Sequence, residues 1–463
     1  MLGGCGGDGG SHSRAPSGSG GAPSVDDAFV AELQERTFRW FWDVTPTRNG
    51  LTPDRWPTPS FSSIAAVGFA LTAYGIGAER GWVTRAQALE RTLSTLRFFD
   101  TAPQGAQATG VTGYQGFFYH FLDIQTGFRH GDVELSSIDT TLLLGGILFA
   151  QSYFDGSSAD EREVRTIADR IYGRVQWTWL SPRAPIVGMG WRPEEGFLEA
   201  DWNQFNEAGL LYVLALGSPT HPVQDGAWNA WTSNFESVWG EHWGQTYAHY
   251  QSMLVYEYSH VWIDFRGIRD SFMASKGMDY FENSRRAVLA QRAYATQNPG
   301  QFRDYGPEIF GFSACDGPGG IDARIDGVQR HFFGYDARGP GADDDGTLAP
   351  MGVGGAVPFA PEVTIAALKE MKRRYGEAVY GRYGFIDSFN PTLNDASVSV
   401  DQGRITSGPA GWVNTDYLGI DQGPIVCMIE NWRSGLIWNV MRKNAYIRRG
   451  LTRAGFSGGW LAG

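Results

Sequence analysis

From residue 25 onward, apolar positions recur mainly with the spacing of amphipathic helices, and no clear alternating pattern typical of strands interrupts them. With further helices hidden between residues 251 and 275, we expect about twelve in all. Thr84, Ser158 and the prolines at 361 and 424 mark predicted helix starts. The clearly patterned helices are Asp26–Asp43, Ser62–Ile76, Arg85–Phe99, Ser136–Tyr153, Glu161–Leu180, Asn206–Leu216, Gly226–Trp239, Phe281–Thr296, Pro361–Tyr375 and Pro424–Val440.

This series predicts an all-α fold in which helical hairpins close into an α/α toroid. The helix ends and long loops on one face of such a ring would hold the functional site. Residues 298–361 are Gly-rich, nearly without helical pattern and too long for a plain connector, so we expect them to form a wall of that site. The alternative, a disordered insert, is disfavoured by the many aromatic residues of this segment. They are Phe302, Tyr305, Phe310, Phe312, Phe332, Phe333 and Tyr335.

Residues 1–24 are mostly Gly, Ser, Ala and Pro, which predicts a flexible tether ahead of one domain spanning residues 25–463. Leu2-Gly3-Gly4-Cys5 resembles the end of a bacterial lipoprotein signal, although the charged and apolar segments of such a signal do not precede it. Either the start codon is assigned too late and Cys5 carries a lipid anchor, or Cys5 occurs by chance in a Gly-rich tail. The first interpretation predicts a periplasmic or cell-surface protein.

The net charge of −12 argues against nucleic acid or an anionic membrane surface as the main partner. Aromatic residues make up 14% of the chain, which suits an aromatic-lined groove for a neutral polymer. Three scattered cysteines form neither a disulfide framework nor a metal cluster, and no His-x-x-x-His occurs, so we expect no metal site. Nucleophile-elbow and phosphate-loop motifs are also missing from the sequence, which disfavours serine hydrolases and nucleotide-dependent enzymes.

Carboxylates stand at the mouths of three apolar helical stretches. Burying an ionised carboxylate there costs free energy unless it is paired, hydrogen-bonded or used in function. The repetition of such acids therefore indicates a cavity. Aromatic residues nearby would complete a sugar-cleaving cleft, because carboxylates cleave glycosidic bonds while aromatic faces bind pyranose rings. The acids are Asp132, Glu134, Asp139, Glu207, Asp421 and Glu430, and the aromatic residues are Trp191, Trp202, Phe205, Trp262 and Trp412.

Four of these acids are candidate catalytic residues. Asp139 lies near a helix start, which favours the ionised form and suits a base, or alternatively a helix cap. Glu207 follows aromatic residues that would raise its pKa, as a general acid requires, although a helix start would lower it. Asp132 and Glu134 alternate before the same helix as Asp139, so both could reach the cleft or serve as partners of the helix dipole.

Other segments are less specific. Residues 258–266 mix donors and aromatic rings, which suits sugar hydroxyls, although a lone histidine such as His260 is more often structural. Asp421 precedes Gly423-Pro424 and is as compatible with a helix cap as with function.

Several blocks, in the same order along residues 28–450, resemble the bacterial glucoamylase-like (glycoamylase) domain family that includes glycoside hydrolase family 144, the β-1,2-glucanases. The blocks are Val133–Thr140, Asn206-Glu207-Ala208, Leu214–Pro222, Tyr305–Gly311, Asp345–Pro350 and Gly419–Pro424.

The resemblance implies an (α/α)6 toroid, periplasmic or surface exposure, and hydrolysis of β-1,2-linked glucan without metal or organic cofactor. It makes Glu207 the general acid and places Asp139, Glu134 and Asp132 in the pocket; Asp139 is our choice of base. It also implies inversion, with carboxyl groups about 6.5–9.5 Å apart. We expect substrate to be bound by Trp202, Phe205, His260, Trp262, Arg266, Tyr305, Glu308, Phe310 and Asp416.

We therefore expect a monomeric hydrolase that cuts β-1,2-glucan within the chain. One rival is an exo-acting hydrolase on the same toroid that releases sophorose. The other is a non-catalytic glycan-binding lipoprotein that kept the groove and lost the chemistry.

Overall fold

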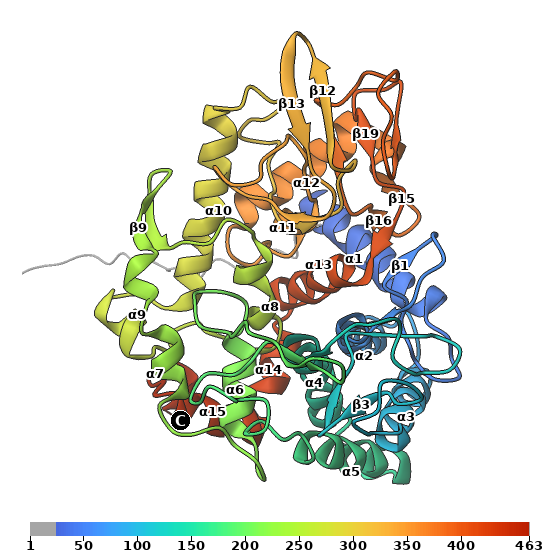
Figure 1. Cartoon of the computed structure of the whole chain (residues 1–463), viewed down its shortest axis with the longest axis vertical. Helices are drawn as coiled ribbons and strands as arrows, with labels where there is room; N and C mark the ends of the chain where they lie inside the picture. The colour runs from blue at the N-terminus through green and yellow to red at the C-terminus, as the bar shows by residue number, and fades with distance from the viewer. Residues whose placement is uncertain (1–24, 463) are drawn as a thin grey trace, which may run out of the picture.

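The computed structural model describes residues 25–462 and is mainly helical (Figure 1). The predicted tether, with Cys5, lies outside the described residues. Among the helices of residues 25–462, none has the length and hydrophobicity needed to cross a membrane. The α-helices are α1 (Val25–Val44), α2 (Ile64–Glu79), α3 (Arg85–Thr101), α4 (Ser137–Tyr153), α5 (Ala159–Gly173), α6 (Gly209–Gly217), α7 (Ala227–Thr232), α8 (Leu254–Trp262), α9 (Ser271–Ser275), α10 (Tyr280–Gln297), α11 (Met351–Gly354), α12 (Pro361–Tyr375), α13 (Gly419–Arg433), α14 (Leu436–Met441) and α15 (Ala445–Arg453).

The core is built from helices that are apolar nearly all round, namely α2, α4 and α6, which are buried along almost their whole length. α2 packs against both α4 and α13, and α13 in turn contacts α8 and α11 in the middle of the molecule (Figure 1). Helices α3 and α5 carry one apolar face each and cover α2 and α4 from outside. The six-hairpin toroid stays a prediction at this level of description.

Two glycines let α2 and α4 touch through their backbones. A Cβ added at Gly68 would lie 2.1 Å from the carbonyl oxygen of Leu142, and one added at Gly146 would lie 2.0 Å from the carbonyl oxygen of Gly68. Neither space can hold a methyl group, so the crossing depends on glycine at both positions.

Most predicted helices are confirmed to within a few residues, including the capping box of Thr84 with Gln87 and the proline at the start of α12. The helices predicted to run to residues 180 and 239 end earlier, at residues 173 and 232. The last long helix begins at Gly419, so Pro424 lies inside it rather than at its start. Proline has no N–H, which leaves the Ile420 carbonyl without its helical partner; the Tyr258 hydroxyl donates to that carbonyl at 3.2 Å instead.

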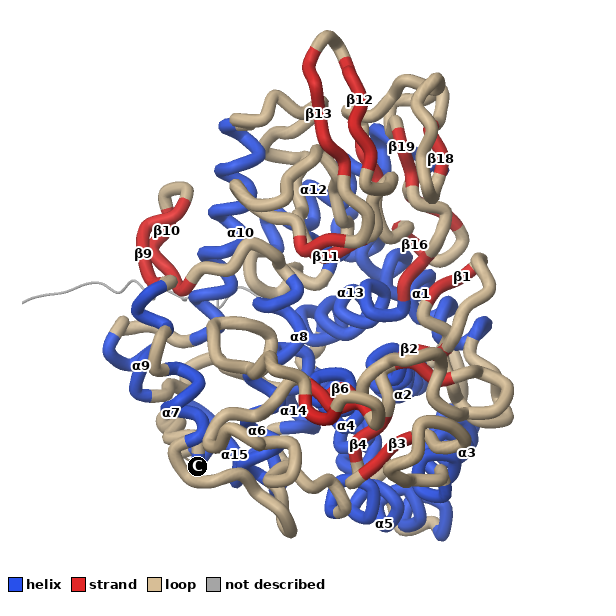
Figure 2. Tube along the Cα trace, viewed as in Figure 1, coloured by secondary structure: helices blue, strands red, loops and turns tan. Residues whose placement is uncertain are grey.

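The expectation of a purely α fold is wrong in detail, because short antiparallel strand pairs occupy the connections (Figure 2). The hairpins β9–β10 and β12–β13 project from the helical body. Most other strands have only two residues, too few for an alternating pattern to show in the sequence. The strands are β1 (Arg55–Trp56), β2 (Ser62–Ser63), β3 (Gly113–Tyr114), β4 (Phe117–Phe118), β5 (Phe121–Leu122), β6 (Leu135–Ser136), β7 (Gly190–Arg192), β8 (Gly196–Phe197), β9 (Trp239–His242), β10 (Gln245–Ala248), β11 (Ala314–Cys315), β12 (Ile321–Ile325), β13 (Val328–Phe332), β14 (Asp336–Ala337), β15 (Tyr380–Gly381), β16 (Gly384–Phe385), β17 (Phe389–Asn390), β18 (Arg404–Ile405), β19 (Trp412–Val413) and β20 (Tyr417–Leu418).

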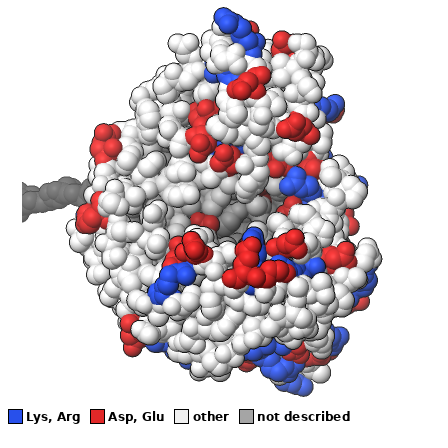
Figure 3. All heavy atoms as spheres, in the orientation of Figure 1, with Lys and Arg blue, Asp and Glu red and all other residues white. Residues whose placement is uncertain are grey.

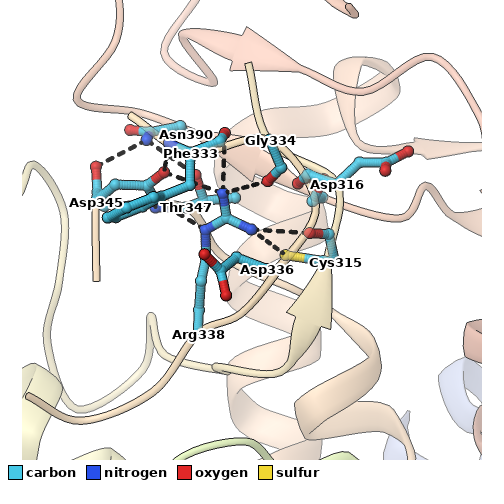
Figure 4. A network of polar contacts seen from close by, with 12 residues as sticks. Cys315, Asp316, Phe333, Gly334, Asp336, Arg338, Asp345, Thr347 and Asn390 are labelled. Carbon is cyan, nitrogen blue, oxygen red and sulfur yellow. Dashed lines mark hydrogen bonds and ion pairs between the residues drawn. The ribbon is translucent and has the colours of Figure 1, made fainter. Parts of the chain in front are cut away.

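The long connection between α10 and α12 is organised around one buried arginine (Figure 4). The guanidinium of Arg338 is fully buried and pairs with Asp345 at 3.0 Å. It also donates to the carbonyl oxygens of Cys315 and Gly334, both at 2.8 Å, and of Phe333 at 3.2 Å. These bonds fix the backbone immediately before Tyr335, whose side chain stays 55% exposed.

Candidate active site

Glu207 lies in the turn just before α6, whose first helical residue is Gly209 rather than the predicted Asn206. The Ser259 hydroxyl holds this turn by donating to the Glu207 carbonyl at 2.9 Å and accepting from the Leu210 N–H at 2.8 Å. Burial raises the pKa of the Glu207 carboxyl to about 7, with a smaller contribution from the negative charge of Asp139. The carboxyl is therefore able to donate a proton near neutral pH.

Asp139 is in the first turn of α4, where its carboxylate accepts a short hydrogen bond of 2.5 Å from the Ser136 hydroxyl. On its other side lies His120, with Nε2 at 3.5 Å from the Asp139 carboxylate and Nδ1 at 3.0 Å from that of Glu134. Burial opposes protonation of this histidine, but Asp139 and Glu134 outweigh it and raise the His120 pKa to about 9. At neutral pH an imidazolium thus lies between two carboxylates.

A second group of acids surrounds Arg55. Its guanidinium is 2.7 Å from Asp316 and 3.2 Å from Asp54, and both carboxylates are buried. The Asn414 amide bridges two of the acids by donating to Asp316 at 3.0 Å and to Asp387 at 2.7 Å.

Asp421, in the first turn of α13, is the buried partner of Asp387. Burial and the mutual repulsion of the neighbouring carboxylates raise the pKa of Asp387 to about 6 and hold that of Asp421 well above its usual value. Two carboxyls in such a setting titrate as a pair and hold a proton between them in neutral solution. Asp421 is not a helix cap, because the N-cap position of α13 is Leu418 and carries no side-chain cap bond.

These groups face one site. Burial raises the pKa of the Tyr258 hydroxyl, and the charges of Asp421 and Glu207 raise it further, so this hydroxyl lies within electrostatic reach of both acids. The charge of Asp54 likewise acts on His120, which joins the acids around Arg55 to the acids around His120. Figure 3 shows a hollow in the middle of this face of the molecule with acidic side chains along its margins.

Glu134 and Asp139 both contact His120, and the charge of Asp139 acts on Glu207, so these three acids lie near one another; their catalytic roles stay a prediction. Asp132 instead is exposed to solvent in the loop before β6. Trp202 is buried and donates from its indole N–H to the Ser137 hydroxyl at 2.8 Å, so it supports the start of α4 from behind.

Two other residues predicted to contact substrate are buried and support neighbouring segments instead. Phe205 is buried against Phe235 and Tyr256. Asp416 is buried and accepts from the Thr58 N–H at 2.9 Å, which anchors the loop after β1.

The predicted sugar contacts at His260 and Trp262 are wrong, because both side chains are buried in the core. Trp262 is completely buried and stacks on Phe69 with ring centroids 5.3 Å apart. His260 is 4% exposed, contacts the Ser284 hydroxyl at 3.2 Å, and has its pKa lowered to about 3 by burial. Arg266 pairs with Asp264 at 2.8 Å. Donors mixed with aromatic rings are typical of a buried polar network as much as of a sugar site, and here they form the former.

The structure places four further predicted residues away from the acid groups. Phe310 is completely buried, and Tyr305 is buried with its hydroxyl donating to Asp344 at 2.8 Å. Glu308 is exposed on the loop between them, outside the acid groups described above. Glu430 is a structural ion-pair partner of Arg80 at 2.7 Å.

Sequence reasoning missed several residues of the site. They belong to short loops and two-residue strands, where no periodicity marks them, and their partners are far away in the chain. They are His120, Asp54, Arg55, Asp316 and Asp387.

Comparisons with known proteins agree with this picture. A model of the Glycoamylase family, described as "Putative glucoamylase", matches residues 199–445, which is more than half of the chain. An exo β-1,2-glucooligosaccharide sophorohydrolase (non-reducing end) from Parabacteroides distasonis is 25% identical over 459 residues, covering 93% of this chain. The chain spans 58% of the length of that relative.

Two solved structures superpose over nearly the whole chain. One, from Bacteroides uniformis and described as a "putative glucoamylase", is 28% identical with a TM-score of 0.80 and covers 95% of this chain and 100% of its own. The other is an endo-β-1,2-glucanase from Chitinophaga pinensis in complex with sophorotriose and glucose; it is 25% identical with a TM-score of 0.79 and the same coverage, 95% and 100%.

Proposed function

Because the chain belongs to the Glycoamylase family, we propose that it is a glycoside hydrolase that cleaves β-1,2-glucan. The observation that carries the proposal is the pKa of about 7 at Glu207, next to the charged Asp139. One carboxyl that holds its proton near neutrality and a second that is ionised are the pair that acid–base cleavage of a glycosidic bond needs. The names of the relatives, an exo-acting sophorohydrolase and an endo-β-1,2-glucanase, supply the linkage.

In the proposed reaction Glu207 acts as the general acid. Its proton passes to the glycosidic oxygen as the bond from that oxygen to the anomeric carbon breaks, so the leaving sugar departs as a neutral alcohol. Burial of Glu207, which raises its pKa, keeps the proton available in the range where the enzyme works.

Asp139 acts as the general base in this proposal. Its carboxylate accepts a proton from water while the water oxygen bonds to the anomeric carbon, which inverts the configuration at that carbon. The imidazolium of His120 and the hydroxyl of Ser136 hold the carboxylate in place. After product release, solvent returns a proton to Glu207 and removes one from Asp139, so the cycle closes without a further reactant.

We propose attack within the chain, because the face in Figure 3 has an open hollow with acidic side chains along its margins, which is accessible to a long polymer. Release of sophorose from a chain end is the second candidate, favoured by the name of the relative from P. distasonis. The proposal extends to a monomeric (α/α)6 toroid in the periplasm or at the cell surface, which size-exclusion chromatography and cell fractionation test.

The test is incubation with linear β-1,2-glucan, with β-1,3- and β-1,4-glucans as controls and product length followed over time. A ladder of oligosaccharides from β-1,2-glucan alone supports endo attack, and disaccharide as the sole early product supports exo attack. Glu207→Gln and Asp139→Asn should each lower kcat by about 10²-fold or more. Wild-type turnover in the Glu207 variant would refute the proposal, and glucan binding without new reducing ends would favour a glycan-binding protein.

A further inference from the structure

An open groove of about 650 Å³ lies beside the acids, between the loop after β1 and the turn after β5. Its lining includes Arg55, Ser60, Phe61, Asp123 and His130. The volume is within the range of about 300–1,000 Å³ that is usual for small-molecule sites. Nothing in the proposed chemistry uses this groove.

A row of stacked rings connects the groove to the catalytic acids. His120, which contacts Asp139, stacks on Phe121 with ring centroids 3.9 Å apart. Phe121 lies 4.2 Å from Phe61, and Phe61 lies 4.7 Å from His130 on the groove side. The groove is therefore an extension of the active site rather than a separate surface feature.

The loop that forms one wall is held firmly at both ends. The Thr58 N–H donates to the buried Asp416 carboxylate at 2.9 Å, and the Asp54 N–H donates to the Phe61 carbonyl at 2.8 Å. Arg55 enters the groove from the same segment, fixed by its ion pairs with Asp316 and Asp54. A wall held in this way needs no ordering when a ligand binds.

The chemistry of the lining selects the class of ligand. The exposed ring of His130, which packs on Phe61, offers an apolar face, and the side chains of Ser60, Asp123 and Arg55 offer donors and acceptors at the edges. A pyranose ring has this same combination of an apolar face and a rim of hydroxyls. An anionic sugar is disfavoured, because two carboxylates already balance Arg55 and Asp123 adds another negative charge.

We infer that this groove is a distal subsite that binds a neutral hexose unit of the substrate chain by stacking on His130, whose ring Phe61 supports from the other side. This inference rests on the proposed function for the identity of the chain. Substrates long enough to reach the groove gain binding there, whereas shorter ones are cleaved without it. The subsite would thus set the preference for chain length.

The experiment compares Phe61→Ala and His130→Ala with Phe128→Ala, a matched control at an aromatic residue that is 36% exposed on the neighbouring turn and does not line the groove. kcat/KM is measured on β-1,2-gluco-oligosaccharides of increasing length. We expect each groove variant to lose about tenfold on the long substrates and nothing on the shortest substrate that is cleaved. The control should match wild type at all lengths. An equal loss at every length, or no loss at any length, would overturn the subsite.

A binding measurement tests this inference independently of the proposed function. Oligosaccharide binding to Glu207→Gln is measured by calorimetry with and without Phe61→Ala, and a tenfold weaker affinity for long chains only is expected. If wild type cleaves no β-1,2-glucan, the proposed function fails, and the same comparison is made with a panel of neutral oligosaccharides. Tighter binding by the protein that keeps Phe61 would still support the subsite, and equal binding, or none by either protein, would refute it.

Discussion

Replacing His120 with glutamine removes the cation that lies between Asp139 and Glu134. The pKa of His120 is about 9 in the folded protein, compared with 6.5 for an unperturbed histidine. One pKa unit corresponds to about 1.4 kcal/mol, so the protonated ring stabilises the fold by about 3 kcal/mol. The side chain is 31% exposed, which is low enough for most of this interaction to escape solvent screening.

The sign of the pH dependence follows from the direction of the shift. The folded pKa is above the unfolded one, so the stabilisation is fully present below pH 6.5 and is lost as the pH rises through about 9. The difference in unfolding free energy between wild type and His120→Gln should therefore be largest near pH 6. It should shrink by about 3 kcal/mol on going to pH 10.

Urea unfolding at a series of pH values measures this difference. His331→Gln is the matched control, because its ion pair with Asp322 lies on an exposed hairpin and contributes under about 1 kcal/mol. A difference between wild type and His120→Gln that stays constant from pH 6 to pH 10 would refute the idea that a charged His120 holds the two carboxylates.

Three further predictions concern other parts of the molecule. The rate of glucan cleavage should fall as pH rises through about 7, because Glu207 then loses the proton that it donates; a pH profile of kcat checks this, and a rate still rising at pH 8.5 would contradict it. Arg338→Met should destabilise the protein by about 3–5 kcal/mol, since it leaves Asp345 charged and buried without its partner; urea unfolding measures the loss, and a change below 1 kcal/mol would argue against the buried pair. Gly146→Ala should lower Tm by several degrees because its Cβ would lie 2.0 Å from a backbone oxygen of α2, whereas Gly173→Ala, with its nearest neighbour 4.0 Å away, should leave Tm unchanged or raise it; equal effects in thermal unfolding would discount the steric reason.

The sequence predicted the core helices well because their signals are local. Apolar positions on all sides of α2 and α4, and the cap at Thr84, act over a single helix and need no knowledge of its neighbours. The hairpins were missed because a strand of two to five residues is too short to establish a period. The start of α13 was misplaced because the free carbonyl that Pro424 creates is satisfied by Tyr258, a residue 166 positions earlier.

In the active site, too, residues with a local sequence signal could be predicted and residues that depend on distant partners could not. Glu207 and Asp139 could be found because each stands at the mouth of an apolar helix. His120 could not, since its role depends on two carboxylates that only the folded chain brings to it. The substrate contacts predicted at Trp262 and Phe310 were wrong because an aromatic residue near polar ones has the same sequence pattern in a core as in a cleft.

The backbone contact between α2 and α4 has a consequence for how the enzyme tolerates mutation. Asp139 is carried by the first turn of α4, and the segment with Asp54 and Arg55 leads into α2, so the two acid groups are attached to helices that meet at Gly68 and Gly146. The spacing of these groups is set by main-chain atoms and not by the size of core side chains. Substitutions in the core should therefore shorten the lifetime of the enzyme at high temperature long before they change its turnover at moderate temperature.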